Sequence, residues 1–89
     1  MIDIFSAEFT RQAAKFISKL DSFAKKRVKN RIEKLEKEPF PQEVEKVEDY
    51  LGEKVFRVRV GDLRILFIVR YNPNKIIITK VDKRERVYD

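Results

Sequence analysis

The chain has 89 residues, of which 40% are charged and 43% hydrophobic, with a formal net charge of +6 and neither cysteine nor histidine. This composition excludes disulfides, thiolate metal sites and a histidine general base. A chain of this length predicts one domain, residues 1–89, because domains usually run to about 100–150 residues. No apolar run approaches the roughly 20 residues of a membrane span, and the N-terminus lacks a signal-peptide pattern. We therefore expect a cytoplasmic protein with no membrane partner, no metal and no other cofactor.

Positive charge is concentrated in the second part of the chain. Residues 1–53 hold 11 Lys and Arg against 11 Asp and Glu, whereas residues 54–89 hold ten against four, so the whole excess follows residue 53. Such an asymmetry favours a polyanionic partner. A high content of charged residues is also typical of thermophile proteins. That composition does not explain why residues 1–53 are neutral overall and residues 54–89 are basic.

The first half predicts a short strand and two helices. Ile2 and Ile4 alternate as in a strand over Met1–Phe5, and Ser6 suits the N-cap of a first helix. The apolar residues that then recur at helical spacing are Phe9, Ala13, Phe16, Ile17 and Leu20. After a break, Ser22 can cap a second helix that Pro39 and Pro41 end, and its apolar face is Ala24, Val28, Ile32 and Leu35. So short a break predicts an antiparallel helical hairpin.

The second half predicts a meander of strands. Residues 40–53 are acidic and indicate an irregular connecting loop that could include one helical turn. Three β-rich runs follow, separated by turn signals at Gly61-Asp62 and at residues 72–75: Val55–Val60, Leu63–Tyr71 and Ile76–Asp82. Helices followed by strands predict an α+β fold, in which a helical hairpin covers one face of a small antiparallel sheet.

The first predicted hairpin places three arginines on one face. With Gly61-Asp62 as a two-residue turn, Arg59 lies opposite Arg64, and Arg57 lies opposite Leu66. Because faces alternate along a strand, one face is entirely apolar and the other carries all three arginines. Like charges opposite each other destabilise a sheet, so three arginines without an acid favour a phosphate site over a solvated face that happens to be basic.

The C-terminal segment is a second candidate for contact with RNA. Lys83, Arg84 and Arg86 cluster there, and Tyr88 follows them. Basic residues beside an aromatic ring suit RNA, because rings stack on unpaired bases. A frayed, charged tail is the alternative interpretation.

The start of the second helix is a third basic group. It includes Lys25 and Lys26, and positive charge in a first helical turn opposes the helix macrodipole. The group either contacts RNA or forms a plain solvated face.

With two helices, the hairpin motif FRVRVGDLRILF (residues 56–67) and the ending KRERVY (residues 83–88), the chain resembles the RelE family of toxins, within the RelE/ParE superfamily. The resemblance covers nearly the whole chain. It implies a metal-independent mRNA endonuclease that cuts in the ribosomal A site, by attack of the ribose 2′-hydroxyl on the adjacent phosphate, and so inhibits translation. It also implies three partners: a RelB-like antitoxin in a hetero-oligomer, the ribosome and mRNA.

The resemblance assigns a catalytic set by position. It consists of the two basic residues of the first hairpin strand, the arginine of the second strand, a C-terminal arginine and a terminal tyrosine: Arg57, Arg59, Arg64, Arg84 and Tyr88. The reaction needs a base for the 2′-hydroxyl, cations for the charge on the phosphorane, and an acid for the departing 5′-oxygen. Arg59, Arg64 and Arg84 suit the second task, and Tyr88 could orient or deprotonate the hydroxyl or stack on a base.

These residues do not identify the general base. Arg57 stands where many relatives have lysine, and arginine is a poor proton acceptor. Asp82-Lys83 stands where many relatives have Gly-His. Glu85, Tyr88 and Lys83 are the candidates that the sequence leaves open.

Two other functions are open. One is a ParE-like toxin that inhibits DNA gyrase by binding and cuts nothing, and the other is an RNA-binding relative without activity. ParE-type relatives generally lack the full arginine set and the terminal tyrosine, so Arg64, Arg84 and Tyr88 favour the endonuclease.

Overall fold

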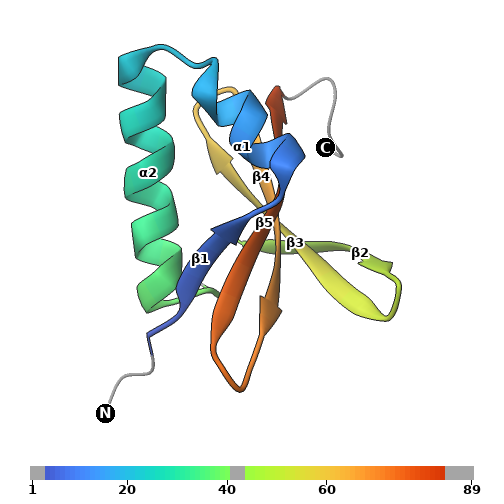
Figure 1. Cartoon of the computed structure of the whole chain (residues 1–89). Helices are drawn as coiled ribbons and strands as arrows, with labels where there is room; N and C mark the ends of the chain where they lie inside the picture. Colours follow the sequence, from blue (N-terminus) through green and yellow to red (C-terminus); the bar gives the residue numbers. More distant parts are fainter. Residues whose placement is uncertain (1–3, 41–43, 84–89) are drawn as a thin grey trace.

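The computed structural model describes residues 4–40 and 44–83, which form two helices and five strands (Figure 1). In chain order they are β1 Ser6–Phe9, α1 Arg11–Ser18, α2 Ser22–Lys37, β2 Glu45–Tyr50, β3 Glu53–Val60, β4 Leu63–Arg70 and β5 Lys75–Lys83. The strands make one sheet in the order β1-β5-β4-β3-β2. The predicted α+β fold is confirmed. The sheet is mixed rather than antiparallel, because β1 runs parallel to β5.

The N-terminal strand lies later than the sequence predicts. It spans Ser6–Phe9, so Ser6 is not the N-cap of α1 and Phe9 is not a helical residue; residues 1–3 of the predicted strand lie outside the described residues. The cap of α1 is Thr10, whose hydroxyl accepts from the N–H of Ala13 at 3.2 Å and donates to the carbonyl of Thr79 at 2.9 Å. This one side chain therefore both starts the helix and ties it to β5.

The second helix also starts on a cap other than the predicted one. Asp21 Oδ1 accepts from the N–H of Ala24 at 2.8 Å, and Ser22 is the first helical residue. An aspartate is the better cap here because its charge also complements the positive end of the helix dipole. The helix ends at Lys37 because Glu38, directly before Pro39, is extended, as residues before proline usually are.

Residues 45–50 form a strand, so the predicted irregular loop is wrong over that range. β2 pairs antiparallel with β3 through a turn in which Leu51 and Gly52 have φ of +51° and +82°. The strand is acidic and has few apolar residues because it is an edge strand, held by backbone pairing on one side only. The three predicted β runs match β3, β4 and β5 to within two residues at each end.

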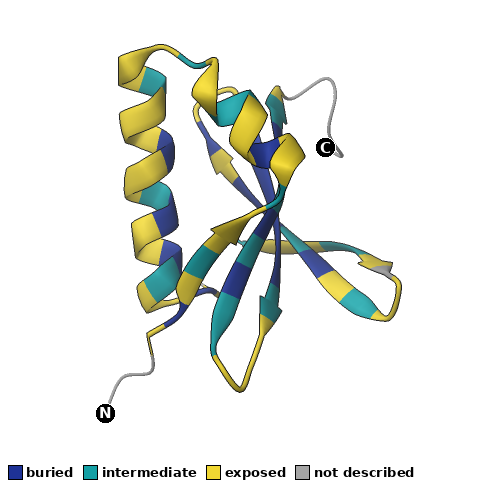
Figure 2. Cartoon of the chain, in the orientation of Figure 1, coloured by how far each residue is buried: buried dark blue, intermediate teal, exposed yellow. Residues whose placement is uncertain are grey.

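The register of the β3–β4 hairpin is the predicted one, with Arg59 opposite Arg64 and Arg57 opposite Leu66. Gly61 has a φ of +60°, which glycine adopts readily at the first position of such a turn. Figure 2 shows the buried residues of α2 turned towards the sheet. They belong to the main core between the helices and the apolar face of the sheet, whose most buried members include Val28, Leu35, Val58, Ile65, Phe67, Ile76 and Ile78. Neither helix of the described segments is long and apolar enough to cross a membrane.

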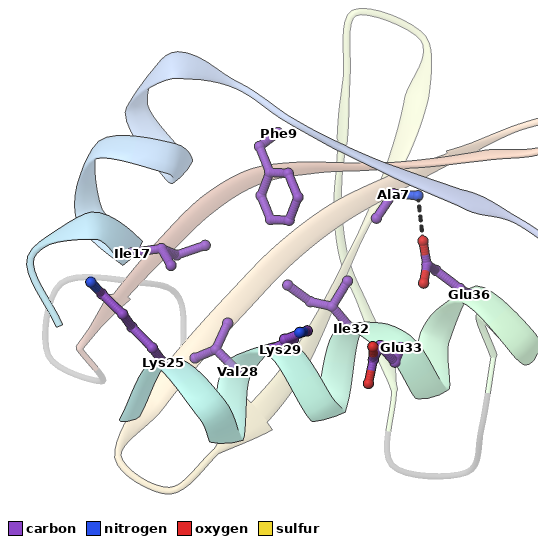
Figure 3. A pocket seen from close by; sticks show the side chains of 9 residues that line it. All are labelled: Ala7, Phe9, Ile17, Lys25, Val28, Lys29, Ile32, Glu33 and Glu36. Carbon is purple, nitrogen blue, oxygen red and sulfur yellow. Dashed lines mark hydrogen bonds between the residues drawn. The ribbon is translucent and has the colours of Figure 1, made fainter. Parts of the chain in front are cut away.

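The C-terminal end of α2 is fastened to β1. The N–H of Phe5 donates to the carbonyl of Glu36 at 2.8 Å, and the N–H of Ala7 donates to Glu36 Oε2 at 2.9 Å (Figure 3). Glu36 therefore covers part of an edge that would otherwise offer N–H groups to another strand. A groove of 270 Å³ lies between α2 and β1, lined by Ala7, Phe9, Ile17, Lys25, Val28, Lys29, Ile32, Glu33 and Glu36.

Candidate functional site

The face of the sheet that turns away from the helices carries the predicted arginines. Directly paired residues share a face, so the cross-strand register defines two rows of side chains. One row is Arg59, Arg64 and Asp82, and the other is Glu45, Arg57, Leu66 and Lys80. We call these two rows together the arginine face.

The first row joins β3, β4 and β5. Arg59 is exposed, whereas Arg64 is 3% exposed and donates from Nη1 to the carbonyl of Leu63 at 3.2 Å. Asp82 lies opposite Arg64 on β5 and accepts from the N–H of Lys83 at 2.7 Å. The hairpin itself brings no acid to this face, as predicted, but the neighbouring strand does.

The second row holds an ion pair. Glu45, the first residue of β2, lies opposite Arg57, and its Oε2 is 2.7 Å from Nη2 of that arginine. The arginine side chain is only 7% exposed and the glutamate side chain 57%. A nearly buried cation thus holds a carboxylate that remains open to solvent. Lys80 completes the row on β5, on the far side of Leu66.

The sequence did not reveal either acid of the arginine face. The place of Glu45 opposite Arg57 could not be predicted, because its segment lacks the apolar alternation of a strand. Asp82 was hidden by a bulge: the register of β4 with β5 shifts between Leu66 and Phe67, and a shift of one residue exchanges the faces. Only a sequence signal for that bulge would have paired Asp82 with Arg64.

An apolar patch adjoins the charged rows on the same face. Val55, Leu66 and Ile68 are buried there, and Val47 and Ile77 pack against them. Their alternation with core residues is what the strand period requires. Leu66 belongs both to this patch and to the row of Arg57, so the apolar patch and the charged rows are continuous on this face. Within the described segments, no buried side-chain nitrogen or oxygen lacks a hydrogen-bond partner.

The other predicted site residues do not all join the arginine face. Arg84, Arg86 and Tyr88 lie outside the described residues. Lys83 is exposed at the end of β5 and pairs with Leu63, which places it on the helical side of the sheet. Lys25 and Lys26 are exposed on α2, which also belongs to the helical side.

The basic start of α2 nevertheless lies beside the tip of the arginine hairpin. The guanidinium of Arg27 stands 5.7 Å from the centre of the Phe23 ring. The same guanidinium lies so close to Gly61 that a side chain there would meet its Nη1 at 2.8 Å. A basic side chain of α2 therefore lies at the turn of the β3–β4 hairpin that carries the three arginines.

No three His, Cys, Asp or Glu side chains come together as a metal site would require, within residues 4–40 and 44–83. The charged groups of the arginine face instead offer guanidinium donors, one ammonium and two carboxylates. Guanidinium groups bind phosphate oxygens through paired N–H donors, and carboxylates accept protons. The face is thus equipped for anion binding and for proton transfer.

Known proteins with similar sequences are toxins of toxin–antitoxin systems. The profile of the family described as the ParE toxin of the type II toxin–antitoxin system, parDE, matches residues 7–88. A protein of Methanocaldococcus jannaschii described as the candidate toxin RelE1 is 32% identical over 85 residues, which are 94% of this chain and 94% of that protein.

Solved structures of such proteins share the fold. A chain of the archaeal RelE–RelB complex from Pyrococcus horikoshii OT3 matches with a TM-score of 0.79 and 28% identity, over 94% of this chain and 99% of that one. A chain of the toxin–antitoxin complex RelBE2 of Mycobacterium tuberculosis also matches with a TM-score of 0.79, over 94% and 95% of the two chains. Its identity is 22%, so that likeness concerns the fold alone.

Proposed function

The chain belongs to the RelE/ParE superfamily of toxins from type II toxin–antitoxin systems, and on that premise we propose that it is a ribosome-dependent mRNA endonuclease. The observation that carries the proposal is the arginine face. Arg59 and Arg64 stand side by side on paired strands, although like charges in that position destabilise a sheet. Asp82, opposite Arg64 on β5, offsets part of that repulsion. A phosphate bound at the exposed Arg59 would offset the rest, and an RNA backbone supplies one at every nucleotide.

The proposed reaction needs no metal ion. The ribose 2′-oxygen attacks the adjacent phosphorus, and negative charge grows on the phosphorane oxygens. Fixed cations aimed at those oxygens stabilise the transition state more than the ground state. We assign this task to Arg59, Arg64 and, by resemblance, Arg84, with Tyr88 orienting the hydroxyl or stacking on a base.

Contacts with RNA outside the reacting phosphate are assigned to exposed basic side chains. Lys25 and Lys26 lie on the helix whose Arg27 reaches the hairpin tip, so they could follow RNA around that turn. Lys83 and Arg86 flank the proposed C-terminal arginine in the sequence. Such contacts position RNA without reading its sequence.

We assign a RelB-like antitoxin as the partner that holds the toxin inactive. The similar solved structures include complexes of RelE with RelB. An antitoxin that masks the arginine face would need acidic side chains, because the part of this chain from residue 54 onwards carries the whole net charge of +6.

A second candidate function is inhibition of DNA gyrase without cleavage. The observation that favours it is the matching family profile, which is described by the ParE name. The arginine face favours the endonuclease, since inhibition by binding does not require cations focused on one phosphate.

Primer extension on mRNA, incubated with programmed ribosomes and the purified protein, tests the proposal. We expect cuts within the codon in the A site, and a fall of about 100-fold or more in cleavage by Arg64→Ala and by Arg84→Ala, because each removes one donor to the phosphorane. Arg70→Ala is the matched control. It lies six residues from Arg64 along β4, about 20 Å away, and should cut normally.

Three results would contradict the proposal or its site. Intact message at every codon together with inhibited gyrase would replace the endonuclease with the second candidate. Intact message without inhibited gyrase would leave an RNA-binding relative without activity. Normal cutting by both Arg64→Ala and Arg84→Ala would show that the phosphate binds elsewhere. Circular dichroism of each variant verifies that the fold is retained, which matters because Arg64 is buried.

A further inference from the structure

The arginine face contains an acid to which the proposed reaction has so far given no task. The side chain of Glu45 lies on the same face as Arg59 and Arg64, in the neighbouring row. It is 57% exposed, and its position is fixed by the 2.7 Å contact with Arg57. The reaction, in turn, needs a proton acceptor, and no arginine of this face can accept a proton near neutral pH. Of the acceptors that the sequence leaves open, Lys83 lies on the helical side of the sheet, and Glu85 and Tyr88 lie outside the described residues.

We propose that Glu45 accepts the proton of the ribose 2′-hydroxyl and that Arg57 is the positioning residue that holds its carboxylate in place. The inference rests on the proposed endonuclease and deepens it. A carboxylate can accept about four hydrogen bonds, so the bond from Arg57 leaves room for one from a hydroxyl. Arg57 thereby has a role that suits its burial and does not require it to act as a base.

The spacing of the two rows fits this division of tasks. Residues two apart on a strand are separated by about 6.7 Å, and neighbouring strands by about 4.8 Å, so the Cα atoms of Glu45 and Arg59 are roughly 8 Å apart. A phosphate held by Arg59 and Arg64 therefore lies within reach of the Glu45 side chain. The attacked phosphorus is bonded to the 3′-oxygen of the ribose that carries the 2′-hydroxyl, so the hydroxyl would reach the acid when the phosphate reaches the arginines.

Asp82 is the other acid of the face and is less suited to the task. Its Oδ1 accepts from the N–H of Lys83 at 2.7 Å, which fixes the carboxylate against its own strand. It lies opposite Arg64, on the side of the row away from Arg59. Glu45 is the more exposed of the two, and it stands on the edge strand, where a substrate can approach.

The proposed step balances without any added reagent. The bond between the 2′-oxygen and phosphorus forms while the bond between phosphorus and the 5′-oxygen breaks. The proton of the 2′-hydroxyl passes to a Glu45 carboxylate oxygen, and solvent water supplies the proton that the 5′-oxygen takes up. The products are a 2′,3′-cyclic phosphate and a 5′-hydroxyl, and Glu45 returns its proton to solvent.

Glu45→Gln isolates the proton transfer, because the amide oxygen can still accept from Arg57 while the group no longer accepts a proton. We expect the single-turnover rate on programmed ribosomes to fall about 100-fold or more, as loss of a general base usually causes. The concentration of toxin that half-saturates the reaction should change by less than about two-fold, since the phosphate contacts remain. Glu45→Asp should recover part of the rate.

Two matched variants complete the experiment. Glu53→Gln removes another glutamate that an arginine holds, the partner of Arg70, and it lies four residues from Arg57 along β3. It should cut at the wild-type rate. Asp82→Asn removes the other acid of the arginine face and should reduce the rate less than Glu45→Gln does.

The outcomes separate this inference from the endonuclease itself. If the wild-type protein cuts and Glu45→Gln cuts equally fast, the proton acceptor is another group and the endonuclease stands. If Glu45→Gln changes half-saturation but not the rate, the carboxylate serves binding only, and the inference is wrong. A larger loss in Asp82→Asn than in Glu45→Gln would assign the role to Asp82. A wild-type protein that never cuts removes the proposed function and the inference together.

Discussion

The three arginines of the hairpin differ in how far they are buried, although the sequence pattern places all three on the same face. Arg57 and Arg64 are 6% and 3% exposed, and Arg59 is exposed. A buried charge must be matched by partners within the protein, so removing Arg57 or Arg64 disturbs the fold as well as the site. Arg59 can meet a phosphate without such a penalty, which makes it the residue whose substitution reports on binding most directly.

The ion pair between Glu53 and Arg70 predicts a change of stability with pH. Two hydrogen bonds from Arg70, of 2.8 and 3.0 Å, hold the pKa of the Glu53 carboxyl below its usual value of 4.5. A carboxyl whose pKa is lower in the folded chain stabilises the fold above the unfolded pKa. That contribution disappears as the pH falls through the folded pKa.

We therefore expect Glu53→Gln to melt slightly below the wild-type protein at pH 7, and the difference to vanish as the pH falls below 4.5. The effect should be small because solvent screens a surface pair. Thermal unfolding followed by circular dichroism between pH 3 and pH 7 measures it. Arg70→Gln should show the same pH dependence, since it breaks the same pair. A difference that persists unchanged at pH 3 would mean that Glu53 acts by other contacts.

At the scale of single elements, the cap of α2 offers a test between two neighbouring residues. Asp21→Ala removes the acceptor for the N–H of Ala24 and should lower the free energy of unfolding by about 1 kcal/mol, as loss of an N-cap usually does. Ser22→Ala is the control and should change it far less, because Ser22 is already helical. Urea unfolding measures both variants, and a larger effect of Ser22→Ala would contradict the observed cap.

The sequence was sufficient to predict the β3–β4 hairpin, because its turn residues and its alternation of apolar residues indicate the same structure. Gly61-Asp62 indicated the turn, and the alternation of apolar residues with arginines from Phe56 to Ile65 then indicated the register and the face of the arginines. The caps were harder to predict, because Ser6 and Ser22 are also residue types that helix N-caps favour. Only pairing of Ser6–Phe9 with β5, a contact distant in sequence, makes that segment a strand.

The acids of the arginine face depend on contacts that no local pattern contains. Glu45 reaches Arg57 because an acidic segment becomes an edge strand by pairing with β3. Asp82 reaches Arg64 because of one bulge between β4 and β5. Both depend on how strands add to the hairpin, so the sequence predicted the cations of the site and not the anions beside them.

At the scale of the whole molecule, the two faces of the sheet have separate tasks. The helices cover one face and bury the main core, while the arginine face lies on the other side. Glu45 lies opposite Arg57 and Asp82 lies opposite Arg64, so the positive charge of that face is focused on the exposed Arg59 rather than spread evenly. A focused charge should bind a few phosphates at defined places.

The salt dependence of RNA binding tests this focusing. A single strand of RNA loses affinity with a slope of about −0.7 in log K against log salt for each phosphate that the protein neutralises. With a 2′-O-methyl RNA that cannot be cut, Arg59→Ala should therefore make the slope shallower by about 0.7.

Lys19→Ala removes the same charge from an exposed position at the end of α1 and should leave the slope unchanged. Fluorescence anisotropy at salt concentrations from about 50 to about 300 mM measures both variants. Equal changes in the two slopes would mean that RNA responds to the net charge of the molecule. A change in Arg59→Ala alone means that the phosphate meets the hairpin, because the two variants have the same net charge and differ only in where it was removed.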